Sequence, residues 1–258
     1  MAIDFHAKAN RSTYTGRRAD AGWVEAIRHI TDPTGKRVAD IGCGGGIYSL
    51  AWREIGAGDI VGIDFSEEMV AAAREQAGGL DRIAFRQGDA TATGLPSASV
   101  DIVFQRALVH HLKSYEPCFA EAGRLLLPGG RLIVQDRTPA DVQLPGSAEH
   151  IRGYFFECFP RLLTVEAARR PTDAAVRDAL RATGFGATES HLLWEVRRTY
   201  GNRQQLAQDL AGRTGRSILH DLDDREIEAL IDHVEARLPA DRPIIEKDRW
   251  TLWSAVAR

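Results

Sequence analysis

Hydrophobic residues in the first half of the chain occur in short runs, and helical patterns separate most of these runs. Trp23, Ile27 and Ile30 recur at the interval of an amphipathic helix, which a Pro-Thr-Gly turn ends. Five apolar runs are typical of strands: 37–41, 59–64, 82–87, 100–105 and 131–136. Short apolar strands alternating with helices predict a parallel sheet covered on both faces, with right-handed connections.

The pattern changes after residue 136. Residues 137–170 contain three prolines and a cluster of aromatic residues. The later elements that we predict are a helix over 172–183, a strand over 187–196, a helical segment over 202–238 and a last strand over 250–257. We expect one domain over 1–258, made of a lead-in (1–34), a core (35–136) and two insertions that cap an acceptor site (137–170 and 202–238).

Composition excludes several classes of protein. The chain has 258 residues, 44% of them hydrophobic and 27% charged, and a net charge of −3, which gives no general attraction to nucleic acid or anionic membrane. The cysteines, Cys43, Cys118 and Cys158, form no CxxC pair, so we expect neither a metal site nor a disulfide framework. The sequence shows neither the apolar core of a signal peptide nor an apolar run long enough to span a membrane. We therefore expect a cytoplasmic protein.

A glycine-rich loop follows the first predicted strand and precedes a helical pattern. Gly42, Gly44 and Gly46 are spaced G-x-G-x-G, and Ile47 stands where a dinucleotide-binding fingerprint requires a third glycine. Asp40 lies two residues before the first glycine, where a carboxylate repels a pyrophosphate but suits an ammonium group or hydrogen-bond donors. The loop therefore favours a nucleoside without phosphates. The alternative is a tight turn with a buried, hydrogen-bonded aspartate.

Two further strand ends carry residues suited to a nucleoside. Asp64 ends the second strand, where a carboxylate accepts hydrogen bonds from ribose hydroxyls, although it also suits a helix N-cap. Phe65 and Met69 are placed to sandwich an adenine, and core packing is the alternative for Met69. After the third strand comes Gly88-Asp89-Ala90, which suits an adenine amino group and ring nitrogen, or is a simple turn.

Together these segments resemble the class I S-adenosylmethionine-dependent methyltransferases. The resemblance rests on VADIGCGGG, IVGID, GDA, VDIVFQRALVHHL and LLLPGGRLIV, and covers about residues 35–136 with a looser match in the last strands. It implies a Rossmann-like, doubly wound α/β fold, with a seven-stranded, mostly parallel sheet and an antiparallel last strand. It also implies S-adenosylmethionine as methyl donor and S-adenosylhomocysteine as product.

The resemblance implies roles for individual residues. Asp40 and the loop Gly42-Cys43-Gly44-Gly45-Gly46 would hold the methionine part, Asp64 the ribose, and Asp89 with Ala90 the adenine. Gln105 would lie beside the sulfonium. In the N-terminal lead-in, Tyr14 and Arg18 are candidates to cover the cofactor, and a disordered tail is the alternative.

The acceptor side is less defined. Neighbouring residues of a helix point about 100° apart, so His110 and His111 cannot both face the site, and we favour His110 as a base or acceptor-orienting group. Arg106 is a candidate contact for an anionic acceptor. Tyr154 and Phe155 either line an apolar pocket or bury a cap. Arg170 belongs to a group of arginines that we expect to be solvated.

We therefore predict methyl transfer to a small-molecule acceptor by in-line displacement, in a monomer or homodimer without a nucleic-acid or membrane partner. A nicotinamide-dependent oxidoreductase is disfavoured by the missing glycine and by Asp40. A non-catalytic module that binds the nucleoside is the other alternative.

Overall fold

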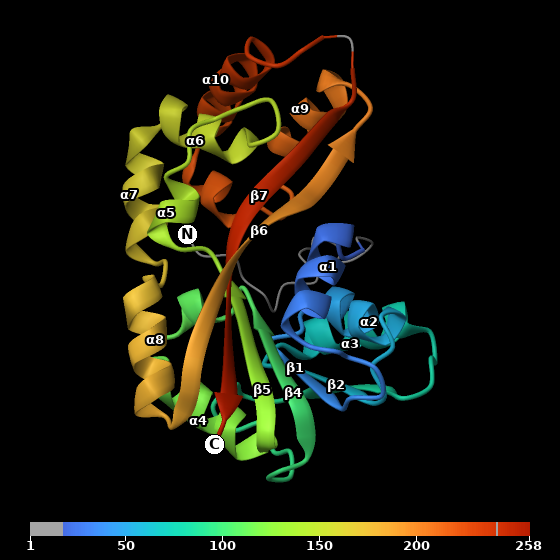
Figure 1. The fold of residues 1–258 in the computed structure, drawn as a ribbon. Helices are drawn as coiled ribbons and strands as arrows, with labels where there is room; N and C mark the ends of the chain where they lie inside the picture. The colour runs from blue at the N-terminus through green and yellow to red at the C-terminus, as the bar shows by residue number, and fades with distance from the viewer. Residues whose placement is uncertain (1–17, 241) are drawn as a thin grey trace. The chain divides into compact units, whose positions relative to one another are not determined.

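The computed structural model describes residues 18–240 and 242–258. Up to residue 136, strands and helices alternate as the sequence predicts, except that no helix separates the strand ending at residue 87 from the strand beginning at residue 100 (Figure 1). The elements are α1 (Ala21–Ile30), β1 (Val38–Ile41), α2 (Ile47–Glu54), β2 (Ile60–Asp64), α3 (Glu67–Ala77), β3 (Ile83–Gln87), β4 (Val100–Arg106), the short 3₁₀ helix η2 (Val109–His111), α4 (Glu116–Leu125) and β5 (Leu126–Asp136).

Further helices and two long strands follow. They are α5 (Pro139–Val142), α6 (Ile151–Cys158), α7 (Pro160–Ala168), α8 (Asp173–Ala182), β6 (Phe185–Tyr200), α9 (Arg203–Ala211), the 3₁₀ helix η3 (Ser217–Asp221), α10 (Asp224–Glu235) and β7 (Ile244–Ala257). Residues 137–170, where the strand–helix rhythm stops, thus form three short helices.

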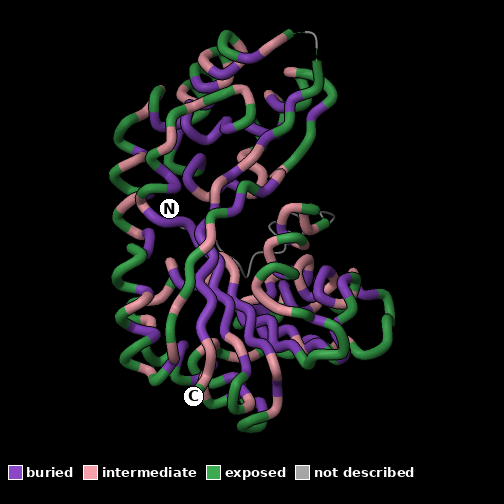
Figure 2. Tube along the Cα trace, in the orientation of Figure 1, coloured by how far each residue is buried: buried purple, intermediate pink, exposed green. Residues whose placement is uncertain are grey.

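The strands in the described part of the chain form one seven-stranded sheet in the order β3-β2-β1-β4-β5-β7-β6. From β3 to β5 neighbouring strands are parallel, and β7 pairs antiparallel with β5. The inner strands are buried on both faces, as parallel strands covered by helices must be (Figure 2). The predicted fold class is therefore confirmed.

Local capping signals in the sequence also hold. The Ser66 hydroxyl accepts a hydrogen bond from the Met69 amide and begins α3, and Gly78 ends that helix in the left-handed conformation. Asp223 and Glu226 form a reciprocal capping box at the start of α10. These short-range contacts fix where the helices begin, and so where the loops at the strand ends lie.

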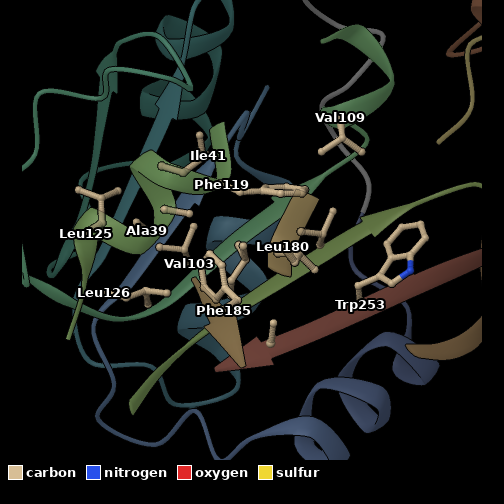
Figure 3. Packing of buried hydrophobic residues seen from close by; sticks show 14 of the residues in the cluster. Ala39, Ile41, Val103, Val109, Phe119, Leu125, Leu126, Leu180, Phe185 and Trp253 are labelled. Atoms are coloured by element: carbon tan, nitrogen blue, oxygen red, sulfur yellow. The ribbon is translucent and has the colours of Figure 1, made fainter. Parts of the chain in front are cut away.

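Two compact units divide the described residues. We call residues 18–136, 171–193 and 251–258 the sheet unit, and residues 137–170, 194–240 and 242–250 the helical unit. The boundaries fall inside β6 and β7, so the helical unit is longer than the two predicted insertions. The core of the sheet unit includes Val103, Phe119 and Trp253, which pack between the sheet and its helices (Figure 3).

The helical unit has its own hydrophobic core, to which Tyr154 and Phe155 belong. Their exposed fractions are 7% and 0%. Both side chains therefore serve this core. Their suggested role as walls of an acceptor pocket stays a prediction.

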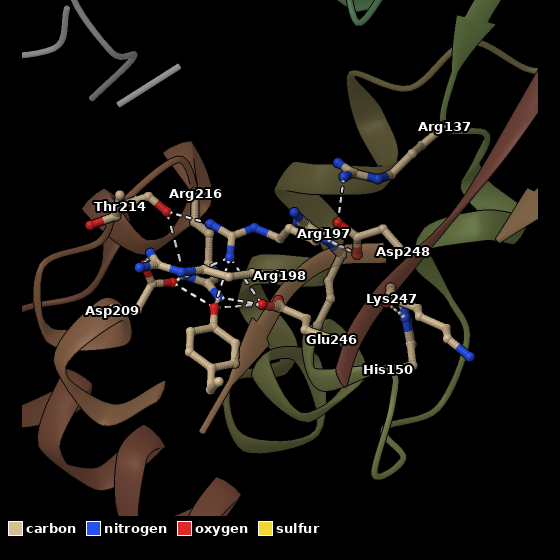
Figure 4. Close-up of polar contacts among 12 residues, drawn as sticks. Arg137, His150, Arg197, Arg198, Asp209, Thr214, Arg216, Glu246, Lys247 and Asp248 are labelled. Atoms are coloured by element: carbon tan, nitrogen blue, oxygen red, sulfur yellow. Dashed lines mark hydrogen bonds and ion pairs between the residues drawn. The ribbon is translucent and has the colours of Figure 1, made fainter. Parts of the chain in front are cut away.

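A network of buried charges lies beside this core (Figure 4). The Arg216 guanidinium contacts both Asp209 and Glu246, and Arg137 and Arg152 both donate to Asp248, at 2.7 and 3.1 Å. Burial alone would raise the pKa of the Asp248 carboxyl. The charges of Arg137 and Arg152 outweigh this effect and hold the pKa well below its usual range. Arg170, which the sequence suggested to be solvated, is buried against Glu166 at 2.5 Å, so that expectation is wrong.

Candidate functional site

The glycine loop joins β1 to α2 in the sheet unit and is tied to the end of β2. The amides of Gly42 and Cys43 donate to the Ile63 carbonyl at 2.7 and 3.0 Å, and the Gly44 amide donates to the Asp64 carboxylate at 2.8 Å. All three predicted loop glycines have positive φ, at 77°, 51° and 84° for Gly42, Gly44 and Gly46. Only glycine adopts this backbone without strain, so the loop requires these residues.

The three glycines differ in what surrounds them. A Cβ at Gly46 would lie 3.0 Å from the Ala73 Cβ, and one at Gly42 would lie 3.2 Å from Leu108. A Cβ at Gly44 would meet no atom within 4 Å. Packing therefore explains Gly42 and Gly46, whereas the backbone of Gly44 faces open space that a ligand can enter.

Beneath the loop, the Asp40 carboxylate is almost completely buried, with an exposed fraction of 1%. The Ser49 hydroxyl, on the first turn of α2, donates to it at 2.5 Å. Burial raises the pKa of Asp40 to about 7, and the nearby Asp64 adds to the rise, whereas the Ser49 hydrogen bond and Arg106 oppose it. A cationic ligand group close to Asp40 would favour the charged carboxylate.

Asp64 and Phe65 stand at the end of β2. The Asp64 carboxylate accepts from the amides of both Gly44 and Ser66, at 2.8 and 3.0 Å. Phe65 is 50% exposed, which is unusual for a large apolar side chain next to a polar loop. Met69 is 2% exposed. Of the two residues predicted to flank an adenine, only Phe65 is therefore exposed.

The end of β3 lies beside the end of β2, because the Gly88 amide donates to the Asp64 carbonyl at 2.9 Å. The exposed Asp89 accepts hydrogen bonds from the Thr91 hydroxyl and amide, which lower the pKa of Asp89. Ala90 follows and is half-buried. The structure thus brings the predicted Gly88–Ala90 turn to the same sheet edge as the glycine loop.

Gln105 and Arg106 end β4, next to β1. The Gln105 Nε2 donates to the Cys118 sulfur at 3.3 Å, while its Oε1 is buried without a hydrogen-bond partner among the described residues. An unmatched buried carbonyl oxygen is costly, so it suggests a ligand contact. The Arg106 guanidinium lies 4.2 Å from the centre of the Tyr48 ring. Its charge also lowers the pKa of Asp40.

His110 lies just beyond the end of β4 and contacts the end of β5. Its Nδ1 is 2.8 Å from an oxygen of Asp136, and its backbone amide donates to the same oxygen at 3.3 Å. Asp136 has no exposed surface, whereas His111 is exposed. We had not singled out Asp136 from the sequence. The available signal was its position as the last residue of the strand predicted beside the fourth one.

The remaining candidates lie elsewhere or add little. Arg18 is exposed and precedes α1, and Tyr14 lies outside the described residues. Cys43 is 9% exposed, and burial raises the pKa of its thiol well above the usual range. In the described ranges, histidine, cysteine and acidic side chains form no group suited to a metal ion. A search of the same ranges also found no helix long and apolar enough to cross a bilayer.

Comparison with known proteins identifies the type of domain. A family model for a methyltransferase domain matches residues 39–134, which include the ends of β1, β2, β3 and β4 described above. The chain is 31% identical to a demethylmenaquinone methyltransferase of Deinococcus radiodurans, over 64% of this chain and 75% of that protein. It is 33% identical to a 27-O-demethylrifamycin SV methyltransferase of Amycolatopsis mediterranei, over 50% of this chain and 52% of that protein.

A solved structure shares the fold. It is phosphoethanolamine N-methyltransferase 2 of Haemonchus contortus in complex with S-adenosyl-L-methionine, with a TM-score of 0.60 and 19% identity. The match covers 98% of this chain and 60% of that one.

Proposed function

The chain belongs to the class I S-adenosylmethionine-dependent methyltransferases, and from that premise we propose that it methylates a small-molecule acceptor. It is a methyltransferase, and its cofactor is S-adenosylmethionine. Methylation of a small acceptor by in-line displacement is supported by relatives whose names specify different small acceptors. Those names do not agree on one molecule, so the proposal stops at this class.

The observation that carries the proposal is the open backbone at Gly44 above the buried Asp40 carboxylate. We infer that the loop holds the methionine part, with its ammonium group near Asp40, because a buried carboxylate gains most from a nearby cation. The exposed ring of Phe65 suits an adenine, and Asp64 suits the ribose. The residues present therefore fit the cofactor.

The cofactor supplies a methyl group on a positively charged sulfur, which is already an activated leaving group. This chain's residues then have to bind and align the two reactants, which can contribute roughly 7–11 kcal/mol to lowering the barrier. We assign Gln105 to the sulfur side of the site, where its Oε1 would contact polarised C–H groups. We assign His110 to the acceptor side, because it lies beyond the same strand end.

The test is transfer of a tritiated methyl group from S-adenosylmethionine to the compounds of a bacterial metabolite extract. The proposal predicts labelled products of low molecular mass, and none when the protein is heat-denatured. Cofactor binding without any labelled product would contradict catalysis and favour the alternative, a non-catalytic binding module.

A further inference from the structure

His110 and Asp136 form a buried pair that ordinary cofactor binding does not require. The His110 Nδ1 lies 3.0 and 2.8 Å from the two Asp136 oxygens, and the His110 amide also donates to Asp136. We propose that Asp136 orients His110 as a general base, and that the acceptor is therefore a hydroxyl compound. This inference rests on the proposed function and narrows its acceptor to one chemical class.

The geometry fixes which ring nitrogen is basic. An ionised carboxylate accepts hydrogen bonds but cannot donate them. The proton of a neutral His110 ring therefore resides on Nδ1, the nitrogen that faces Asp136. The basic atom is then Nε2. Asp136 has no exposed surface and ends β5, one residue after the last pair of its ladder with β4. A rigid sheet edge therefore sets the orientation of the imidazole.

The backbone around His110 is also constrained. The Ala107 amide donates to the Gln135 carbonyl at 2.8 Å, and Ala107 then turns the chain with a φ of 52°. The left-handed conformation is unfavourable for a residue other than glycine. Leu108, the next residue, packs against Gly42 of the glycine loop. The strained turn thus attaches the His110 segment directly to the proposed cofactor site.

A base of this kind discriminates between acceptors. A neutral amine attacks with its own lone pair and loses a proton only afterwards, and a thiol ionises readily at a pKa near 8.5. A phenol has a pKa near 10, so about 0.1% of it is ionised at neutral pH. Of these three acceptors, the hydroxyl therefore gains most from proton removal as the new bond forms.

A lone pair of the acceptor oxygen forms the new bond to the methyl carbon, and the carbon–sulfur bond breaks with its electron pair going to sulfur. The hydroxyl proton moves to the His110 Nε2. The resulting imidazolium is stabilised by Asp136, and its proton later passes to solvent. Oxygen is thereby methylated, and the sulfonium becomes a neutral thioether.

Among the described residues, the titratable groups of His111 and Tyr115 lie near the His110–Asp136 pair. Asp136 contacts the His110 ring and stabilises its charged form. The centres of the His110 and His111 rings are 4.0 Å apart, and the charge of Asp136 acts on the Tyr115 hydroxyl. Burial and the Asp136 charge both raise the pKa of Tyr115, so Tyr115 stays neutral near pH 7.

The experiment compares His110→Ala and Asp136→Asn with His220→Ala, which alters an exposed histidine of the helical unit. Acceptor probes are p-cresol, p-toluidine and p-thiocresol, which differ only in their –OH, –NH₂ or –SH group, together with the product isolated from a metabolite extract. We expect the methyl group on a hydroxyl oxygen, a kcat loss of about 10²–10⁴-fold in His110→Ala and about 10–10³-fold in Asp136→Asn. His220→Ala should stay within about threefold of the original.

Two readouts separate catalysis from a structural role. The Kd for S-adenosylmethionine should change less than about threefold in all three variants, and the acid limb of the kcat–pH profile should vanish in His110→Ala. Nitrogen-15 NMR of labelled histidine should show His110 protonated on Nδ1, and Asp136→Asn should alter that tautomer.

Several results would overturn the inference. These are methylation of the amine or thiol but not of a hydroxyl, full activity in His110→Ala, or a His110 protonated on Nε2 in the original protein. The NMR result needs no acceptor, so it decides the tautomer even if no labelled product forms. Absence of any product would count against the proposed function as well.

Discussion

The glycine loop of the sheet unit and the charge network of the helical unit both bury acidic groups, but they do so differently. Asp40 is buried with the Ser49 hydroxyl as hydrogen-bond donor, and its pKa rises to about 7. Asp248 is buried between Arg137 and Arg152, and its pKa falls. Asp40 can therefore still gain from a bound cation, whereas Asp248 is already paired with two arginines.

This contrast separates a binding site from a structural element. A buried group whose charge is poorly compensated destabilises the fold, so its retention points to a ligand. A buried group with complete ion pairs contributes to the fold itself, and removing one partner is costly. The predictions below test this difference between the two units.

The largest expected effect is on stability in the helical unit. Asp248→Ala removes the carboxylate that both Arg137 and Arg152 contact, and should lower the free energy of unfolding by about 3–5 kcal/mol. Urea denaturation followed by circular dichroism measures this loss. Asp59→Ala is the control, because it removes an exposed ion pair with Arg82 and should cost less than about 1 kcal/mol. Equal losses would mean that the buried network adds no special stability.

The next effect is on cofactor affinity. Gly44→Ala places a Cβ in the open space above the loop and should weaken S-adenosylmethionine binding at least about 100-fold, roughly 2.7 kcal/mol. Gly129→Ala is matched, because Gly129 also has a positive φ and open space around its Cα. Both should lose about 1–2 kcal/mol of stability from backbone strain. Calorimetry that finds equal affinities in the two variants would refute a ligand at Gly44.

A pH dependence follows from the pKa of Asp40. Below about pH 7 the empty protein keeps a proton on Asp40, and a bound ammonium group must expel it. Affinity for S-adenosylmethionine should therefore fall about tenfold per pH unit as the pH drops from 7 to 5.5. Above pH 8 it should fall again as the cofactor amine, with a pKa of about 8, loses its charge.

Two variants check this assignment. Asp40→Asn should abolish the dependence below pH 7, and Ser49→Ala should move it to higher pH, because it removes a hydrogen bond that lowers the pKa of Asp40. The raised pKa of Asp40 also makes the stability of the protein depend on pH. Between pH 3.8 and about 7 the folded protein holds a proton that the unfolded chain releases, so the free energy of unfolding should decrease as pH rises. An unchanged slope in Asp40→Asn would assign it to another group.

The smallest effect concerns the exposed ring of Phe65. Phe65→Ala should weaken binding by about 1–2 kcal/mol, roughly 5- to 30-fold, through lost stacking, with little change in stability. Leu80 is similarly exposed, at 53%, and Leu80→Ala should leave the affinity unchanged. Titration with adenosine should show the same difference between the two variants. If both bind adenosine equally well, Phe65 does not contact the base.

The sequence predicted best what neighbouring residues determine. The glycine loop, the Ser66 cap and the capping box at Asp223 all depend on residues within a few positions. The Ser49–Asp40 contact spans nine positions and escaped notice. The alternation of apolar runs was sufficient for the five strands up to residue 136, whereas β6 and β7 are longer than the predicted strands 187–196 and 250–257.

Contacts between distant residues were not predictable in this way. His110 and Asp136 are 26 positions apart, and Arg137 and Asp248 are 111 apart. Arg170 was expected in solvent because charges usually are. Its burial against Glu166, four positions earlier, also involves a more distant residue, because Arg152 contacts the same Glu166. Such pairs depend on which elements pack together, which a single sequence does not specify.

The most direct test of the central claim is a calorimetric titration of the full chain at pH 7.5 with S-adenosylmethionine and, separately, with NAD. The open Gly44 backbone beside Asp40 predicts saturable binding of S-adenosylmethionine, and NAD binding at least about 100-fold weaker, because a buried carboxylate repels a pyrophosphate. NAD binding as tight as that of S-adenosylmethionine would contradict the account.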